Sequence, residues 1–228
     1  MGSITMGPDK RLVKFIKEKY QITNFIETGT YQGGTTEWSA DVFKNVYSIE
    51  FSEHWYNYTK ERLKSRENVN LLFGDTKSIL PDLLPKVNNA ILWLDAHWCG
   101  DHSFGEKDQC PLLVELEIIN RFKHLFDKLF IMIDDARLFL SPPHHPHSLT
   151  DYPDLAEIMQ ALSPERQIYV FNDIILAVPK SYQHEFSILL QNLATEDLKV
   201  DVVPMPSIKN QIVRKIRHKI STIITRKK

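Results

Sequence analysis

Short apolar runs alternate with longer segments whose apolar residues recur every three or four positions. The apolar runs predict strands, and the segments between them predict helices. Strands are expected at 24–26, 46–50, 69–73, 90–94 and 129–133, and helices at 35–43, 54–66, 78–84 and 112–126. Strands that alternate with helices in this way form parallel sheets with right-handed crossovers. The pattern therefore predicts an α/β fold with a doubly wound sheet.

The pattern changes in the last third of the chain. Residues 168–171 and 174–178 are apolar runs that flank Asn172 and Asp173, which predicts an antiparallel hairpin. Helices are expected at 155–162 and 181–193, after a loop at 141–151 that is rich in Pro, His and Ser. We expect a mostly parallel sheet with this hairpin at one edge, in a single domain spanning residues 9–200.

A basic tail occupies residues 201–228. From Ile208 onward it holds eight Lys or Arg residues and no acid, whereas the rest of the chain has 20 basic and 29 acidic residues. Its apolar residues recur at spacings of three and four, which predicts an amphipathic helix. Such a helix could pack on its own domain, mediate self-association or lie on an anionic membrane surface. No base-reading module accompanies it, so nucleic acid is not a clear partner.

Composition places the chain among soluble globular proteins. It has 228 residues, of which 43% are hydrophobic and 25% are charged. No apolar run approaches the roughly 18 residues that span a bilayer, and the start lacks the apolar core of a secretory signal. Only two cysteines are present, which favours a reducing compartment. We expect a cytoplasmic protein, with contact at the inner membrane face as an alternative.

The first candidate site is the segment Glu27–Thr36, between a predicted strand and a predicted helix. Its glycines, Gly29, Gly33 and Gly34, would let the backbone turn sharply and approach a ligand. Their spacing differs from the G-x-G-x-x-G dinucleotide pattern, which disfavours a nicotinamide-dependent oxidoreductase. The alternative is a tight turn that binds nothing.

Acidic residues follow the next two strands. Glu50 ends the second strand, about 20 residues after the glycine turn, where an acid can accept both hydroxyls of a ribose. Asp75 follows the third strand after Gly74 and could hydrogen-bond an adenine amino group. A simple turn that ends the strand is an equal alternative for Asp75.

Three more carboxylates, Asp95, Asp134 and Asp135, follow the fourth and fifth strands. These positions lie at the sheet edge where open α/β sheets bind ligands. Neighbouring carboxylates repel one another unless a cation or proton compensates, and Mg²⁺ prefers oxygen ligands. The three residues are therefore candidate ligands of Mg²⁺. Alternatively, Asp95 caps the loop that follows it, and Asp134 and Asp135 bind backbone amides.

Together these motifs resemble class I S-adenosylmethionine-dependent methyltransferases, over residues 24–137. Asp95, Asp134 and Asp135 look like the carboxylates of metal-dependent O-methyltransferases, including those that act on sugars. The resemblance implies a Rossmann-like domain and O-methylation of a sugar, glycan precursor or other small hydroxyl compound. The cofactor-binding residues that it implies are Glu27, Gly29, Thr30, Tyr31, Gly33, Thr35, Thr36, Glu50, Asp75 and Asp95.

Asp95 and His97 are the candidate catalytic residues. Either could take the acceptor's proton, and the unperturbed pKa of histidine, near 6.5, suits His97 as a general base. Three alternatives stay open: a hydrogen-bonded structural histidine, a metal-independent methyltransferase with His97 as base, and a nucleoside-binding module without catalysis. A zinc site on His97, Cys99, His102 and Cys110 matches no standard spacing. The loop with His144, His145 and His147 could close the acceptor side.

Overall fold

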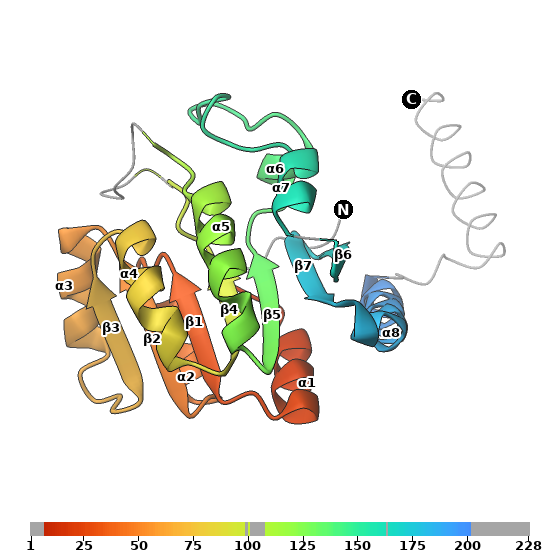
Figure 1. Cartoon of the computed structure of the whole chain (residues 1–228), viewed down its shortest axis with the longest axis horizontal. Helices are drawn as coiled ribbons and strands as arrows, with labels where there is room; N and C mark the ends of the chain where they lie inside the picture. Colours follow the sequence, from red (N-terminus) through yellow and green to blue (C-terminus); the bar gives the residue numbers. More distant parts are fainter. Residues whose placement is uncertain (1–6, 99, 101–107, 163, 202–228) are drawn as a thin grey trace, which may run out of the picture. The chain divides into compact units, whose positions relative to one another are not determined.

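The computed structural model describes residues 7–98, 100, 108–162 and 164–201. Seven strands form one sheet in the order β3-β2-β1-β4-β5-β7-β6 (Figure 1). The strands are β1 (Asn24–Thr28), β2 (Asn45–Glu50), β3 (Val69–Phe73), β4 (Asn89–Leu94), β5 (Lys128–Ile133), β6 (Arg166–Phe171) and β7 (Ile174–Pro179). The first five are parallel, whereas β7 runs antiparallel to β5 and β6. The predicted doubly wound sheet with an edge hairpin is confirmed.

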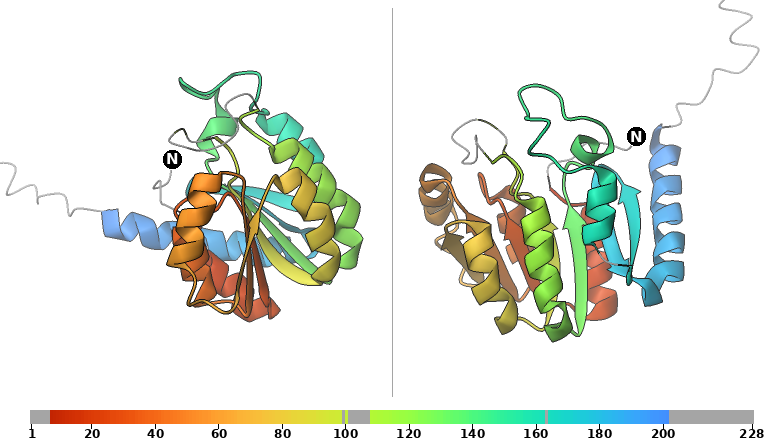
Figure 2. Two further views of the ribbon diagram at one scale, coloured as in Figure 1. Left: turned by 90° about the vertical axis from the view of Figure 1, so that its left-hand side faces the viewer. Right: turned by 45° about the horizontal axis from the view of Figure 1, so that its top comes forward.

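Helices cover both faces of the sheet. They are α1 (Lys10–Tyr20), α2 (Gly34–Ala40), α3 (Glu53–Arg62), α4 (Thr76–Leu83), α5 (Leu112–Phe122), α6 (Arg137–Leu140) and α7 (Leu155–Ala161), with 3₁₀ turns at Leu84–Lys86, Lys123–Leu125 and Lys180–Tyr182. Viewed along the sheet, α1, α2 and α3 lie on one face and α4 and α5 on the other (Figure 2).

Burial explains why the central strands are so uniformly apolar. Every residue of β1 is buried, as are the last five residues of β4 and of β5, because helices pack on both faces of a parallel sheet. One core cluster fills the space between the sheet and helices α4, α5 and α7, and includes Leu80, Leu92, Leu116, Ile131 and Ile158. By contrast, β3 is an edge strand and stays half-exposed.

The hairpin turn follows directly from local chemistry. Asn172 and Asp173 both have positive φ, 46° and 65°. A two-residue hairpin loop of the primed kind requires this conformation at both positions, and Asn and Asp tolerate it. The turn brings Asp173 to the edge of the sheet where β5 ends, which matters for the site below.

Several predicted boundaries shift by a few residues. Helix α1 was not predicted, although Leu12, Ile16 and Tyr20 recur every four residues and are buried. Asp9 caps α1 by accepting from the backbone amides of Arg11 and Leu12. Ser52 caps α3 as expected. The helix predicted at 112–126 ends at Phe122 and continues as a 3₁₀ turn.

The chain divides into two compact units, Met1–Gln183 and His184–Lys228. Helix α8 (Gln183–Asp201) runs from the first into the second. The amphipathic helix predicted in the basic tail lies outside the described residues, so the boundary proposed at residue 200 stays a prediction. In the described part of the chain, no helix is long and apolar enough to cross a membrane.

Candidate active site

Strand register gathers the predicted motifs at one edge of the sheet. Thr28 pairs with Ile49 and with Leu94, and Leu94 pairs with Ile133. Because paired parallel strands end at the same level, the turns after β1, β2, β4 and β5 lie side by side. The residues chosen from sequence therefore share the carboxyl edge of the sheet.

The turn after β1 depends on glycine. Gly29, Tyr31 and Gly33 all have positive φ, at 82°, 48° and 77°. A Cβ built on Gly29 would lie 2.2 Å from the carbonyl oxygen of Asp95, so the turn and the segment after β4 are in direct backbone contact. Tyr31 is held in its strained conformation, with its ring against Trp55 at 4.4 Å between centroids. The strained backbone and the close contact indicate that the surrounding structure holds this turn in one defined conformation.

Three of the residues predicted to bind the cofactor, Glu27, Thr30 and Thr36, have buried side chains that hydrogen-bond within the protein. Glu27 is 1% exposed and accepts hydrogen bonds from the hydroxyls of Ser48 and Thr36. The Thr30 hydroxyl shares a hydrogen bond of 2.6 Å with Ser48. Burial raises the pKa of Glu27 to about 7, despite these hydrogen bonds. Glu27, Thr30 and Thr36 thus hold the turn in shape from below, and direct contact between them and a cofactor stays a prediction.

Glu50 joins the ends of β1 and β2. Its carboxylate accepts from the backbone amide of Tyr31 and from that of Ser52, both at 2.8 Å. Burial raises the pKa of Glu50 even though these amides favour the charged form. The backbone amides of Thr30 and Phe51 hydrogen-bond the same carboxylate. Contact between Glu50 and a ribose stays a prediction.

Asp75 has a structural role at the start of α4. Its side chain accepts from the backbone amide of Lys77 at 2.9 Å and caps the helix. This matches the simpler of the two interpretations made from sequence. Contact with adenine stays a prediction for this residue, and so does cofactor contact for Thr35 at the start of α2.

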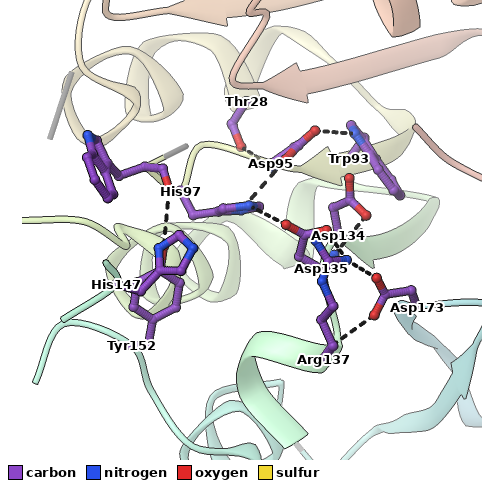
Figure 3. A network of polar contacts seen from close by, with 11 residues as sticks. Thr28, Trp93, Asp95, His97, Asp134, Asp135, Arg137, His147, Tyr152 and Asp173 are labelled. Carbon is purple, nitrogen blue, oxygen red and sulfur yellow. Dashed lines mark hydrogen bonds and ion pairs between the residues drawn. The ribbon is translucent and has the colours of Figure 1, made fainter. Parts of the chain in front are cut away.

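His97 lies between two of the predicted carboxylates (Figure 3). Its Nε2 donates to Asp135 Oδ2 at 2.8 Å, while its Nδ1 faces Asp95 Oδ1 at 3.6 Å. Since an ionised carboxylate only accepts, this contact places the imidazole proton on Nε2 and leaves the Nδ1 lone pair on the Asp95 side. A histidine that is oriented in this way by a carboxylate is typically a general base.

Other groups of the chain engage two of the three carboxylates that are predicted to bind Mg²⁺. Asp134 accepts from the backbone amide of Asp135 at 2.7 Å, and Asp135 is paired with His97 and with Arg137. Within the described ranges, no group of three His, Cys, Asp or Glu side chains is arranged so that it could hold a metal ion. The Arg137 guanidinium already compensates the charge of Asp135, so this geometry does not support Mg²⁺, and its binding by the three carboxylates stays a prediction.

Sequence reasoning missed Arg137 and Asp173. The Arg137 guanidinium lies 2.6 Å from Asp135 Oδ1 and also pairs with Asp173, whose carboxylate accepts from the Arg137 backbone amide as well. Asp135 itself has a positive φ of 55°. The only signal in the sequence is that Arg137 follows two acids closely. Asp173 is brought in by the hairpin turn, which no local pattern connects to Asp135.

These contacts separate the acid strengths of the three carboxylates. Burial and then the charges of Asp134 and Asp135 raise the pKa of Asp95 well above its usual range. Burial and the Asp135 charge raise the pKa of Asp134 to about 6. Burial opposes ionisation of Asp135, but the hydrogen bond from His97 and the charges of His97 and Arg137 lower its pKa. Asp135 is therefore the charged partner that holds His97.

The loop at 141–151 forms a wall beside this network. The Tyr152 hydroxyl bonds His147 Nδ1 at 3.0 Å and donates to the Trp98 carbonyl, so the loop is tied to the segment after β4 (Figure 3). Gln109 adds a second tie by accepting from the Ser148 amide at 2.7 Å. The alternative zinc site included Cys99 and His102, which lie outside the described residues.

Comparison with solved structures shows the fold. The methyltransferase PaMTH1 from Podospora anserina, bound to SAH, superposes with a TM-score of 0.52 at 17% identity, over 77% of this chain and 80% of its own. An O-methyltransferase from Bacillus cereus, also in complex with SAH, gives 0.51 at 15% identity, over 76% and 83%. No family model and no curated protein sequence matches the chain. The chain thus has the Rossmann-like fold found in these methyltransferases.

Proposed function

We propose that the protein is an S-adenosylmethionine-dependent methyltransferase that transfers a methyl group to a hydroxyl oxygen of a small molecule, sugar or glycan precursor. The observation that carries the proposal is His97, clamped through Nε2 by Asp135 with Nδ1 directed to Asp95 at the carboxyl edge of the sheet. That edge is the ligand-binding edge of open α/β sheets. The likeness in fold to SAH-bound methyltransferases supports the choice of cofactor.

The chemistry of the edge also suits this cofactor. Glu50 ends β2 and Asp75 follows β3 at this edge, and Arg137 is already paired with Asp135. An edge with surplus acid favours a cationic ligand, and the cofactor is a sulfonium cation. When bound, S-adenosylmethionine supplies the electrophilic methyl group. Glu50 would hold its ribose hydroxyls, and the Gly29–Gly33 turn would border its methionine part.

The residues of the chain then have separate tasks. His97 Nδ1 accepts the proton of the acceptor hydroxyl, and Asp135 stabilises the imidazolium that results. Asp95, whose pKa burial raises well above its usual range, hydrogen-bonds the same oxygen and orients it. Arg137 fixes Asp135 from the side opposite His97. General-base catalysis of this kind contributes about 10²- to 10⁴-fold.

The test compares His97→Gln with the wild type and with His124→Gln, an exposed histidine in the 3₁₀ turn after α5. Calorimetric titration with SAH should give the same affinity for all three proteins. Methyl transfer from labelled cofactor to a panel of sugars should fall by at least about 100-fold in His97→Gln only. Activity should also survive EDTA.

Each alternative gives a different result. Absence of SAH binding to the wild type would refute the methyltransferase assignment itself. If His97→Gln binds SAH and keeps its activity, the assignment of His97 as the base is wrong, and the assignment of the cofactor stands. A strict requirement for Mg²⁺ would restore the metal-dependent mechanism expected from sequence. Location in the cytoplasm, and membrane contact or self-association through the tail, remain parts of the proposal that need separate tests.

A further inference from the structure

Glu115 is a buried acid that no step above uses. It lies in α5 and is 1% exposed. The hydroxyls of Thr28, at the end of β1, and Thr76, at the start of α4, hydrogen-bond its carboxyl group. Its Oε1 atom has no hydrogen-bond partner in the part of the chain that the structure describes. A buried polar atom without a partner is costly, so it calls for an explanation.

A partly open cavity lies next to this carboxyl group. Its volume is about 10 Å³, which is room for a group of about the size of one water molecule, and Glu115 and His97 are both in its lining. Leu94, Leu112 and Ile133 supply apolar wall from β4, α5 and β5. The cavity is therefore on the side of the sheet edge where β4 and β5 end, next to the proposed base. An unpaired carboxyl oxygen in such a cavity can accept a hydrogen bond from one small donor group, such as the end of a larger ligand.

Charge indicates which group the subsite takes. Burial raises the pKa of Glu115 to about 7, Asp75 adds to the effect, and His97 opposes it. A hydrogen-bond donor that carries positive charge would satisfy Oε1 and favour the ionised form of Glu115 at the same time. A neutral hydroxyl would supply the hydrogen bond without the charge. A water molecule would do the same without giving the site a function.

We propose that this cavity is the anchoring subsite of the methyl acceptor and binds a protonated amino group on Glu115 Oε1. The acceptor is then an amine-bearing hydroxyl compound, such as an amino sugar or an amino alcohol. The amine is held by Glu115, and the hydroxyl is presented to His97. The inference rests on the proposed function, since it assigns the acceptor of that same site.

The experiment uses methyl-labelled protein and nuclear magnetic resonance. Leu94, Leu112 and Ile133 report on the cavity, and Ile22, which precedes β1 at the opposite edge of the sheet, is the control. Ethylammonium chloride is titrated at about pH 8, where an alkylamine is protonated. Ethanol, of nearly the same size, is the neutral control. The three cavity methyls should shift saturably with ethylammonium at about millimolar concentrations, and Ile22 should not.

Two variants test whether Glu115 binds the ammonium group in the cavity. Glu115→Gln keeps the size of the side chain and removes its charge, so ethylammonium should bind at least about tenfold more weakly. Leu112→Phe fills the cavity and leaves Glu115 unchanged, so it should also abolish the shifts. An otherwise unchanged methyl spectrum shows that each variant is folded. Undiminished binding in either variant would overturn the assignment of the site.

The remaining outcomes separate this inference from the proposed function. Equal shifts with ethanol, or none with either compound, would refute an amine subsite and indicate a cavity for water. Loss of the ethylammonium shifts when SAH is saturating would assign the cavity to the cofactor's own amino group and also overturn the inference. In each of these cases SAH binding, measured by calorimetry, would still support the methyltransferase.

Discussion

Gly29 offers the sharpest test of how the site is built. Replacing it by alanine places a Cβ 2.2 Å from the carbonyl oxygen of Asp95 and 3.0 Å from the Cα of Ala96. All these atoms are backbone, so no side chain can rotate away. The residue must also keep a φ of 82°, which an L side chain disfavours by about 1–2 kcal/mol. Displacing the Asp95 segment adds about 1–3 kcal/mol, as overpacking does in a close-packed interior.

The expected loss for Gly29→Ala is therefore about 2–5 kcal/mol of unfolding free energy. Gly34→Ala is the matched control in the same turn, because a Cβ at Gly34 meets nothing within 4 Å. Gly34 is the first residue of α2, where alanine is neutral or stabilising by up to about 1 kcal/mol. Urea denaturation followed by circular dichroism gives both values.

The two substitutions should also differ in ligand binding. Gly29→Ala moves the segment that carries Asp95 and His97, so SAH affinity and methyl transfer should both fall. Gly34→Ala should leave both nearly unchanged. If Gly29→Ala unfolds at the same urea concentration as the wild type, the close approach of the two turns is not a constraint. The glycine turn would then have no part in positioning Asp95 and His97.

Two further substitutions test single contacts. Glu27→Gln removes an acid whose pKa is about 7 in the folded state and 4.5 in its ordinary range. Between these values the unfolded chain loses its proton while the folded chain keeps it, so wild-type stability should fall by up to about 3 kcal/mol as pH rises from 4.5 to 7. Urea denaturation at pH 5 and pH 8 should show a smaller decline in Glu27→Gln, and an equal decline would contradict the assignment. Asp75→Ala should cost about 1 kcal/mol through the lost cap of α4, whereas Asp75→Ser should keep stability. A lower SAH affinity in Asp75→Ser, measured by calorimetry, would support contact with adenine, and an unchanged affinity would leave Asp75 as a cap alone.

Local sequence predicted which residues share the carboxyl edge of the sheet. Gly29, Glu50, Asp95 and Asp134 each follow or end an apolar run, and strand register brings their turns together, whereas their roles stay predictions. A parallel sheet aligns the ends of its strands, so the position of a residue after a strand is enough to place it. The role of Glu27 was harder to see, because the residues that bury it, Thr36 and Ser48, come from α2 and β2.

The predicted metal site depends on contacts that the sequence does not show. Three acids at one edge require compensation, and from the sequence a divalent ion is the simplest source. In the structure Arg137 compensates the charge of Asp135 and is positioned partly by Asp173, whereas Mg²⁺ binding by the three acids stays a prediction. Asp173 is far from Asp135 in sequence and arrives only because β7 pairs antiparallel with β5. No periodicity in the sequence encodes that pairing.

The sequence by itself determined the five parallel strands, the helices between them, the edge hairpin and the glycine turn. These follow from burial, periodicity and backbone conformation, which act over a few residues. Tertiary structure alone decided which acids are charged, which are buried and which face a cavity. Glu115 illustrates the difference: on a helix it is one acid among many, and only packing against β1 and α4 leaves its Oε1 without a partner beside His97. Desolvation and charge compensation depend on every element that surrounds a group, and so they exist only in the folded chain.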